Sequence, residues 1–148
     1  MPKVAFESST LEKVAVLQPG INVPAEAFGR GLPYVTVQDL YQGTRIPVDE
    51  LRLVEIPASQ VKRFRLKDGD IVIGKSSVKL EGIGYPSRFL DPDIVVIFSG
   101  FTLRVQADES VVNGDYLFYW LRSPELRRWV IANAQRSALT NLNSSITK

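Results

Sequence analysis

The stretch RLKDGDIVIGKSS, residues 65–77, holds the side chains best suited to recognition chemistry. Its apolar run, residues 71–74, is bounded by turn residues and is typical of a short buried strand. Directly after it come lysines and hydroxyl residues, namely Lys75, Ser76, Ser77 and Lys79. A rigid strand end would hold these groups in fixed positions, as contacts with base edges or phosphates require. A solvent-exposed loop with no partner is the alternative interpretation.

The composition removes most catalytic chemistry. The 148 residues contain no cysteine and no histidine, so cysteine nucleophiles, serine–histidine pairs and nearly all zinc sites are absent. The pair Gly82-x-Gly84 lacks the third glycine of a dinucleotide-binding fingerprint. Asp68 and Asp70 flank a turn glycine and are better interpreted as turn formers than as an acid–base pair. We predict no catalytic residue, no metal, no cofactor and no small-molecule substrate.

The charge of the chain is small overall but locally concentrated. Lys and Arg number 18 against 16 Asp and Glu, which gives a net charge of +2. Basic residues gather at 62–67 and 122–136, where they form either a solvated surface or a patch for a polyanion. The chain begins without a signal peptide and has no long apolar span, so we expect a cytoplasmic protein with no membrane partner.

The apolar pattern predicts an α+β fold in a single domain, a β-rich body of mixed and antiparallel strands with a helical pair near the C-terminus. Strands are expected at residues 13–17, 33–37, 51–56, 71–74, 94–98 and 102–105. Short helical turns are expected at 38–43 and from Ser59, as a cap, to Phe64. A loop is expected at 25–31, and a long loop or an irregular hairpin at 78–93. Helical spacing appears at 115–122 and 125–134, on either side of Ser123-Pro124. Residues 1–136 are expected to form the domain and residues 137–148 a polar tail.

Several motifs follow one another in a fixed order. They are GLPYV at 31–35, DLxxG at 39–43, LKxGDIVI at 66–73, a strand pair, DYLxYxLxS at 115–123 and SALxNLN at 137–143. In this order and at these spacings the set resembles the target recognition domain of type I restriction-modification specificity subunits. The resemblance covers roughly residues 12–148.

The resemblance implies a non-catalytic reader of double-stranded DNA. In that family, each specificity subunit carries two target recognition domains, and each domain reads one half of a bipartite site. Long spacer helices separate the domains, while modification (methylase) and restriction subunits perform methylation and cleavage. Because the chain stops at Lys148, where the family continues into a spacer helix, we expect it to correspond either to half of a specificity subunit or to a longer subunit cut at this point.

The resemblance and the residue types together suggest a set of DNA contacts: Arg30, Thr36, Lys75, Ser76, Ser77, Lys79, Tyr85, Arg88, Gln135, Arg136 and Asn141. Tyr85 could stack on a base, and Arg88 could donate a bidentate pair to guanine or to a phosphate. The stretch 135–143 either touches DNA or forms the hinge to the spacer helix. The alternative function is a protein–protein adaptor or modulator of the same fold that does not contact DNA.

Overall fold

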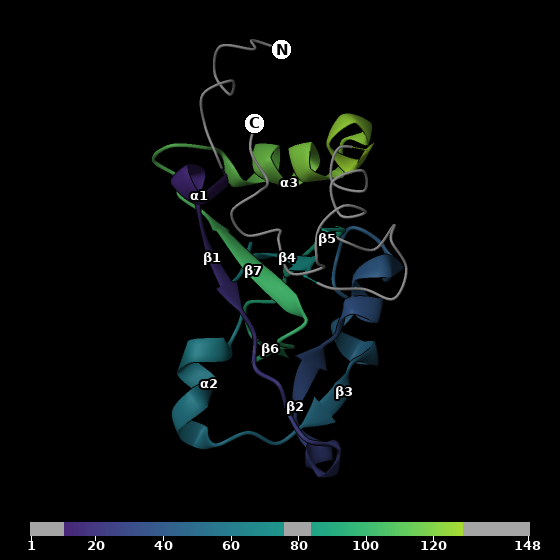
Figure 1. Ribbon diagram of the computed structural model, residues 1–148. Helices are drawn as coiled ribbons and strands as arrows, with labels where there is room; N and C mark the ends of the chain where they lie inside the picture. The colour runs from purple at the N-terminus through teal and green to yellow at the C-terminus, as the bar shows by residue number, and fades with distance from the viewer. Residues whose placement is uncertain (1–10, 76–83, 129–148) are drawn as a thin grey trace.

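The computed structural model describes residues 11–75 and 84–128 (Figure 1). The elements, in chain order, are α1 (Leu11–Val14), β1 (Ala15–Pro19), the 3₁₀ turn η2 (Ala25–Ala27), β2 (Phe28–Val35), η3 (Val37–Gln42), η4 (Val48–Glu50), β3 (Arg52–Val54), α2 (Ala58–Phe64), β4 (Ile71–Gly74), β5 (Pro86–Arg88), β6 (Ile97–Phe98), β7 (Thr102–Ala107) and α3 (Gly114–Arg122). Residues 124–128 are also helical. None of the described helices is long and apolar enough to span a membrane.

The strands form two sheets. A four-stranded sheet has the order β1-β7-β4-β5, and all of its neighbouring strands are antiparallel. A three-stranded sheet has the order β3-β2-β6, in which β2 and β6 run parallel. In Figure 1, α3 lies across one end of the four-stranded sheet, while α2, β2 and β3 occupy the opposite end of the molecule. The predicted α+β architecture with mixed sheets is therefore confirmed.

Strand β4 is buried on both faces, which explains its uninterrupted apolar sequence. Ile71 and Ile73 pack with β7 and with α3 in one core cluster. Val72 points to the other face and belongs to a second cluster that contains Leu40 and Phe98. Alternate side chains of a strand face opposite sides, so a strand between two cores needs no polar position.

Helix α3 shows the expected amphipathic pattern and is capped at its start. Asn113 caps its start, because its side-chain oxygen accepts a hydrogen bond of 3.0 Å from the Tyr116 N–H. Leu117, Phe118 and Leu121 are buried against the sheet. The helix ends at Arg122, just before Ser123-Pro124, as predicted.

Two sequence predictions about elements are corrected, the loop at 25–31 and the cap at Ser59. The expected loop at 25–31 contains the start of β2 at Phe28. Residues 78–93, expected as a long loop or an irregular hairpin, contain β5 (Pro86–Arg88), which pairs antiparallel with β4. The expected strands at 94–98 and 102–105 are observed as the shorter β6 and the longer β7, which lie in different sheets. Helix α2 starts after Pro57 with no side-chain cap, since Ser59 already lies inside the first turn.

Candidate nucleic-acid interface

The two ends of segment 76–83 are fixed by the sheet, although the segment itself lies outside the described residues. At one end, the Lys75 N–H donates a 2.9 Å hydrogen bond to the Phe101 carbonyl. At the other end, the Gly84 N–H donates a 2.7 Å bond to the Gly74 carbonyl. The side chain of Lys75 is half-buried. The predicted contacts Ser76, Ser77 and Lys79 fall within this segment, and Gln135, Arg136 and Asn141 are also outside the described part of the chain.

Tyr85, the residue after Gly84, packs among cations and aromatic rings. The Arg122 guanidinium donates one hydrogen bond of 3.1 Å to the Tyr85 hydroxyl and another of 3.2 Å to the Pro86 carbonyl. Its central carbon lies 5.1 Å from the centre of the Tyr85 ring, and that of Arg127 lies 5.5 Å from the same centre. The Tyr41 ring meets Tyr85 edge-on at 5.6 Å. These distances are within the range of cation–π attraction and of aromatic pairing.

Arg122 and Arg127, the two cations around Tyr85, are both half-buried. Burial lowers the pKa of the Arg127 guanidinium from its ordinary value, and the positive charge of Arg122 lowers it further. The electrostatic interactions with Tyr85 and Tyr41 raise the pKa, and each is larger than that with Arg122. Both effects that lower the pKa arise because a positive charge at this place is poorly solvated or repelled. An anion in contact with the two guanidinium groups would relieve both.

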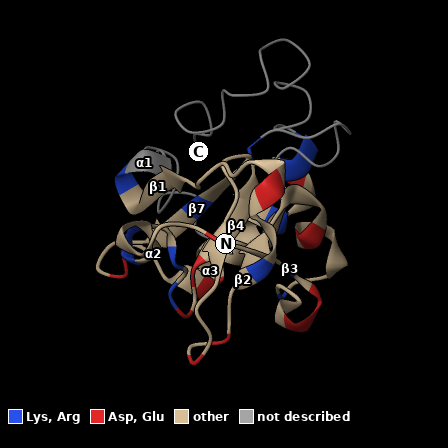
Figure 2. Cartoon of the chain, turned by 90° about the horizontal axis from the view of Figure 1, so that it is seen from below, with Lys and Arg blue, Asp and Glu red and all other residues tan. Residues whose placement is uncertain are grey.

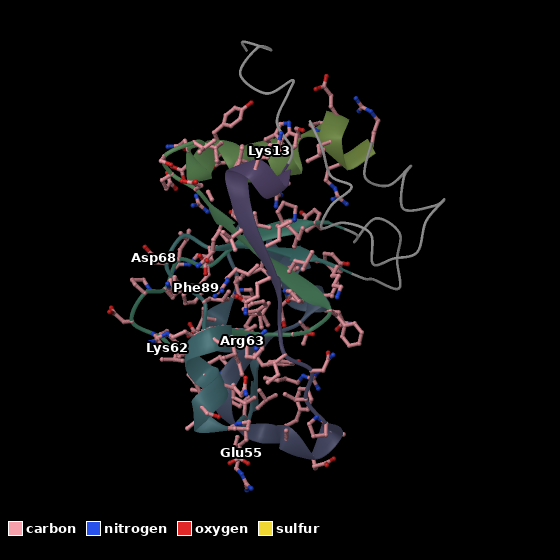
Figure 3. All side chains as sticks on the ribbon, turned by 60° about the vertical axis from the view of Figure 1, so that its left-hand side comes forward. Lys13, Glu55, Lys62, Arg63, Asp68 and Phe89 are labelled. Atoms are coloured by element: carbon pink, nitrogen blue, oxygen red, sulfur yellow. The ribbon has the colours of Figure 1, made fainter. Side chains whose placement is uncertain are left out.

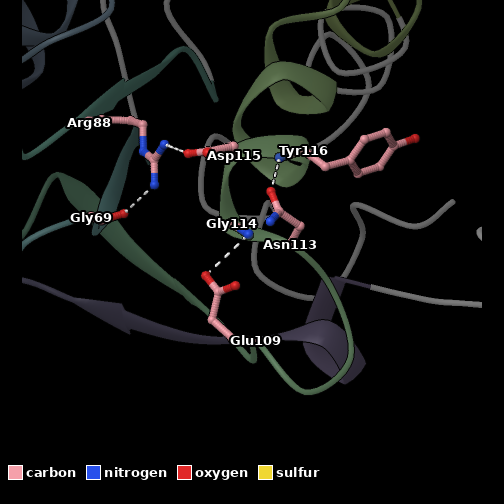
Figure 4. Close-up of polar contacts among 7 residues, drawn as sticks. All are labelled: Gly69, Arg88, Glu109, Asn113, Gly114, Asp115 and Tyr116. Atoms are coloured by element: carbon pink, nitrogen blue, oxygen red, sulfur yellow. Dashed lines mark hydrogen bonds and ion pairs between the residues drawn. The ribbon is translucent and has the colours of Figure 1, made fainter.

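Arg88, predicted to read a base, is held by contacts within the protein (Figure 4). One of its terminal nitrogens forms an ion pair with Asp115 in α3, and the other donates a 3.1 Å hydrogen bond to the Gly69 carbonyl. Only 15% of its side chain is exposed. Its role in DNA reading stays a prediction, and a base contact would require Arg88 to give up these partners.

Thr36 and Arg30 also have partners within the protein. The N–H and hydroxyl of Thr36 donate bonds of 2.8 and 2.9 Å to the Asp39 carboxylate, which closes a capping box at the start of η3. Arg30 forms an exposed ion pair of 2.9 Å with Glu55. Figure 3 shows Glu55 at the end of the molecule opposite Lys13, which precedes β1 near α3. The structure therefore does not bring Arg30 together with Tyr85 and Arg122.

The basic stretches predicted from the sequence are dispersed in space. Lys62 and Arg63 lie exposed on α2 (Figure 3), whereas Arg122 and residues 124–128 lie at the α3 end. Figure 2 shows Lys and Arg at several separate places with Asp and Glu between them. Sequence reasoning identifies the arginines of 122–136 but does not associate them with Tyr85. The high density of arginines in this stretch is the sequence feature that points to them. Their contact with Tyr85 leaves no local pattern, because Arg122 and Tyr85 are 37 residues apart.

Within residues 11–75 and 84–128, no group of three or more potential metal ligands is gathered. A single buried aspartate of this part of the chain, Asp70, instead forms a hydrogen-bond network with its neighbours. Asp70, in the turn before β4, accepts hydrogen bonds of 2.7 Å from the Lys67 N–H and 3.2 Å from the Gln106 amide. Burial raises the pKa of Asp70, and these hydrogen bonds and the charge of Arg104 partly offset that rise. The network stabilises the turn before the strand that leads to Lys75.

The fold is shared with solved structures of type I restriction-modification systems. A chain from a study of complex assembly and conformational transition in the type I R-M system aligns with a TM-score of 0.60 and 15% identity, over 92% of this chain and 38% of that one. The HsdS subunit from Thermoanaerobacter tengcongensis aligns with a TM-score of 0.57 and 15% identity, over 92% of this chain and 39% of that one. The type I S subunit from M. genitalium aligns with a TM-score of 0.55 and 11% identity, over 87% of this chain and 29% of that one.

No protein-family model matches the sequence. No curated protein sequence matches it either. The likeness therefore concerns the fold, and this chain spans less than two fifths of the length of each of the three structural neighbours.

Proposed function

We propose that this chain is a target recognition domain that reads one half of a bipartite double-stranded DNA site in a type I restriction-modification assembly. The observation that carries the proposal is the fold likeness over 87–92% of the chain to chains of type I systems, two of them specificity subunits. Each neighbour is more than twice as long as the matched part, so this chain corresponds to one domain of such a subunit.

The geometry around segment 76–83 supports a reading role. A segment that reads base edges must be held in register by a rigid scaffold, since a shift in position changes which edges its side chains meet. The buried strand β4 and the two backbone bonds at Gly74 and Lys75 supply such a scaffold. Lys75 and the predicted contacts Ser76, Ser77 and Lys79 would then face the DNA, with Arg122 and Arg127 beside them.

The domain acts by binding, and methylation and cleavage belong to partner subunits. Its partners are therefore double-stranded DNA together with modification and restriction subunits, in the cytoplasm. The first structural neighbour was solved in a study of complex assembly in a type I system, which supports this set of partners. No cofactor is required for a function that consists of recognition alone.

Selection from a randomised duplex pool tests the proposal. The purified chain should enrich one short defined sequence at low salt, where phosphate contacts contribute most to the affinity. Lys75→Ala should weaken binding by a similar factor on every sequence and leave the enriched sequence unchanged, if Lys75 contacts only phosphate. Pool binding without enrichment would contradict sequence reading, and the absence of any DNA binding would favour the adaptor alternative.

A further inference from the structure

Arg122 differs from Arg30, Arg45 and Arg88 in its hydrogen-bond partners. Arg30, Arg45 and Arg88 are each ion-paired with a carboxylate, of Glu55, Asp91 and Asp115 respectively. In residues 11–75 and 84–128, the hydrogen bonds of Arg122 go only to the neutral Tyr85 hydroxyl and Pro86 carbonyl. Its charge is therefore oriented but not neutralised by a carboxylate in this part of the chain.

A second guanidinium contacts the same tyrosine ring. Arg127 lies over the same Tyr85 ring, and its pKa is lowered partly by the charge of Arg122. Both side chains are half-buried. Like charges brought together in a partly desolvated place repel each other, and a bound anion would turn this repulsion into attraction.

The donor geometry suits a phosphate. An arginine carries more N–H donors than the two bonds of Arg122 use, and the planar guanidinium fork matches the oxygens of a phosphate. Contacts with Tyr85 and Phe118 fix the plane of Arg122, whose central carbon lies 5.7 Å from the centre of the Phe118 ring. Fixing the plane in advance reduces the entropy that binding would cost.

The position of the pair relates it to the proposed reading segment. Tyr85 is the first residue after Gly84, whose N–H holds the end of segment 76–83 against Gly74. A phosphate bound by Arg122 and Arg127 would therefore lie next to one end of that segment. Contacts with phosphates set the position and orientation of a protein on the duplex and carry no sequence information themselves.

We propose that Arg122 and Arg127 form a binding site for a backbone phosphate of the bound DNA, and that Tyr85 positions the two guanidinium groups. The site deepens the proposed function and rests on it. It gives Tyr85 a different role from the base stacking predicted from the sequence, because its ring and hydroxyl engage the arginines. The site fixes the register of the neighbouring segment on the duplex.

The salt dependence of binding tests the site. Arg122→Gln and Arg127→Gln should each weaken binding by a similar factor on every sequence, and each should lower the slope of log affinity against log salt by about 1. Arg63→Gln, an exposed arginine on the distant α2, is the control with the same loss of charge and should leave the slope unchanged. Tyr85→Leu removes no charge but should lower the slope as well, because the arginines lose their support.

The DNA can be changed as well as the protein. In duplexes of the enriched sequence that carry one uncharged methylphosphonate linkage at a time, one position should weaken wild-type binding yet leave Arg122→Gln and Arg127→Gln unaffected. Such non-additivity identifies the phosphate that the two arginines contact directly. It is also independent of any loss of stability in the variants, because each protein is compared with itself on two duplexes.

Three results would overturn the site. If wild-type protein binds duplex and both arginine variants keep its slope and its methylphosphonate profile, the phosphate site is wrong while the proposed function stands. If inorganic phosphate, but not duplex, shifts the Arg122 and Arg127 side-chain nitrogen resonances, the site takes a small anion instead. If wild-type protein binds no duplex, the proposed function and the site both fall.

Discussion

Arg88 connects three parts of the molecule through one guanidinium group. It extends from β5, pairs with Asp115 in the first turn of α3 and donates a hydrogen bond to the carbonyl of Gly69, in the turn before β4 (Figure 4). Its central carbon also lies 5.5 Å from the centre of the Phe118 ring. With 15% of its side chain exposed, these interactions are only partly weakened by water. Its observed role is to tie α3 to the sheet.

Arg88→Ala should therefore lower the free energy of unfolding, by about 1.5 to 3 kcal/mol, the range for hydrogen bonds that involve a charged group. Arg45→Ala is the matched control. Arg45 also pairs with an aspartate, at 2.6 Å, but 57% of its side chain is exposed, so its loss should cost less than about 1 kcal/mol. Urea unfolding followed by tryptophan fluorescence measures both. An Arg88→Ala protein of unchanged stability that lost its preference at one base pair would instead support the base contact predicted from the sequence.

The carboxylate of Asp70 lies in the protein interior, away from solvent. The residue is buried, and burial raises the pKa of its carboxyl above the ordinary value of 3.8. The folded protein therefore holds the proton more tightly than the unfolded chain does. Between the unfolded and the folded pKa the native state binds more protons, so the contribution of Asp70 to stability falls as pH rises through this window.

Asp70→Asn should reveal this dependence. Well below the ordinary pKa of 3.8 the carboxyl is protonated in both the folded and the unfolded states, so the stabilities of the two proteins should change with pH in the same way. As pH rises from there, wild-type protein should lose stability relative to Asp70→Asn and then level off above the raised pKa. Urea unfolding of both proteins between about pH 4 and pH 7 measures the difference. Asp68→Asn, at an exposed position of the same turn, is the control. A wild-type protein that gained stability relative to Asp70→Asn over this range would show that the hydrogen bonds, and not burial, dominate.

At the scale of elements, β4 connects the cores on its two faces. Ile73 is fully buried among β7 and α3. Ile73→Ala should cost about 2 to 4 kcal/mol, from lost burial and from the cavity that remains. Val16→Ala in β1, where 62% of the side chain is exposed, should change stability by less than about 0.5 kcal/mol. Thermal melts measure both variants. A lower melting temperature for Val16→Ala than for Ile73→Ala would contradict the placement of β4 between the cores.

The elements that the sequence predicts well are those with strong local signals. The sequence predicts strand β4 at its observed bounds, because a short apolar run lies between turn residues. It predicts the first helix of the C-terminal pair to within a residue at its start, because apolar spacing and Pro124 coincide. It does not predict strand β5, since Pro86, Ser87 and Arg88 have little intrinsic strand preference and are extended by pairing with β4.

The candidate site shows a sharper limit of sequence reasoning. Lysines and serines after an apolar run can be recognised locally, and so can a cluster of arginines. Whether an arginine faces solvent or a carboxylate depends on the partners that the fold brings to it. Arg88 meets Asp115 from 27 residues away, and Arg122 meets Tyr85 from 37 residues away. No local pattern distinguishes Arg88, which pairs with a carboxylate, from Arg122, whose hydrogen bonds within residues 11–75 and 84–128 go to neutral groups.

At the scale of the whole molecule, the two sheets are joined where the chain leaves β1. The Ile21 N–H donates a 2.9 Å hydrogen bond to the Phe98 carbonyl, and Ile21 also forms a parallel bridge with Ser99. Gly20 lies between this contact and the four-stranded sheet, where its N–H donates to the Thr102 carbonyl at 3.3 Å. A side chain on Gly20 would place its Cβ 2.1 Å from the Phe98 oxygen and 2.3 Å from the Ser99 oxygen. Both are backbone atoms, so a larger residue forces the sheets apart.

Gly20→Ala should consequently destabilise both sheets together, by about 1 to 3 kcal/mol or more, which is the cost of overpacking a close contact. Gly29→Ala is the control, because Gly29 has open space around it and its φ of +117° alone makes alanine strained. That change should cost about 1 to 2 kcal/mol without moving one sheet relative to the other. Urea unfolding compares the costs of the two changes, and native-state hydrogen exchange of Gly20→Ala tests whether the two sheets unfold together. In Gly20→Ala, the amides of β4 and of β2 should lose protection by equal amounts, because unfolding of a small domain is cooperative. Loss of protection confined to β2, β3 and β6 would show that the two sheets unfold separately and that the Gly20 contact does not couple them.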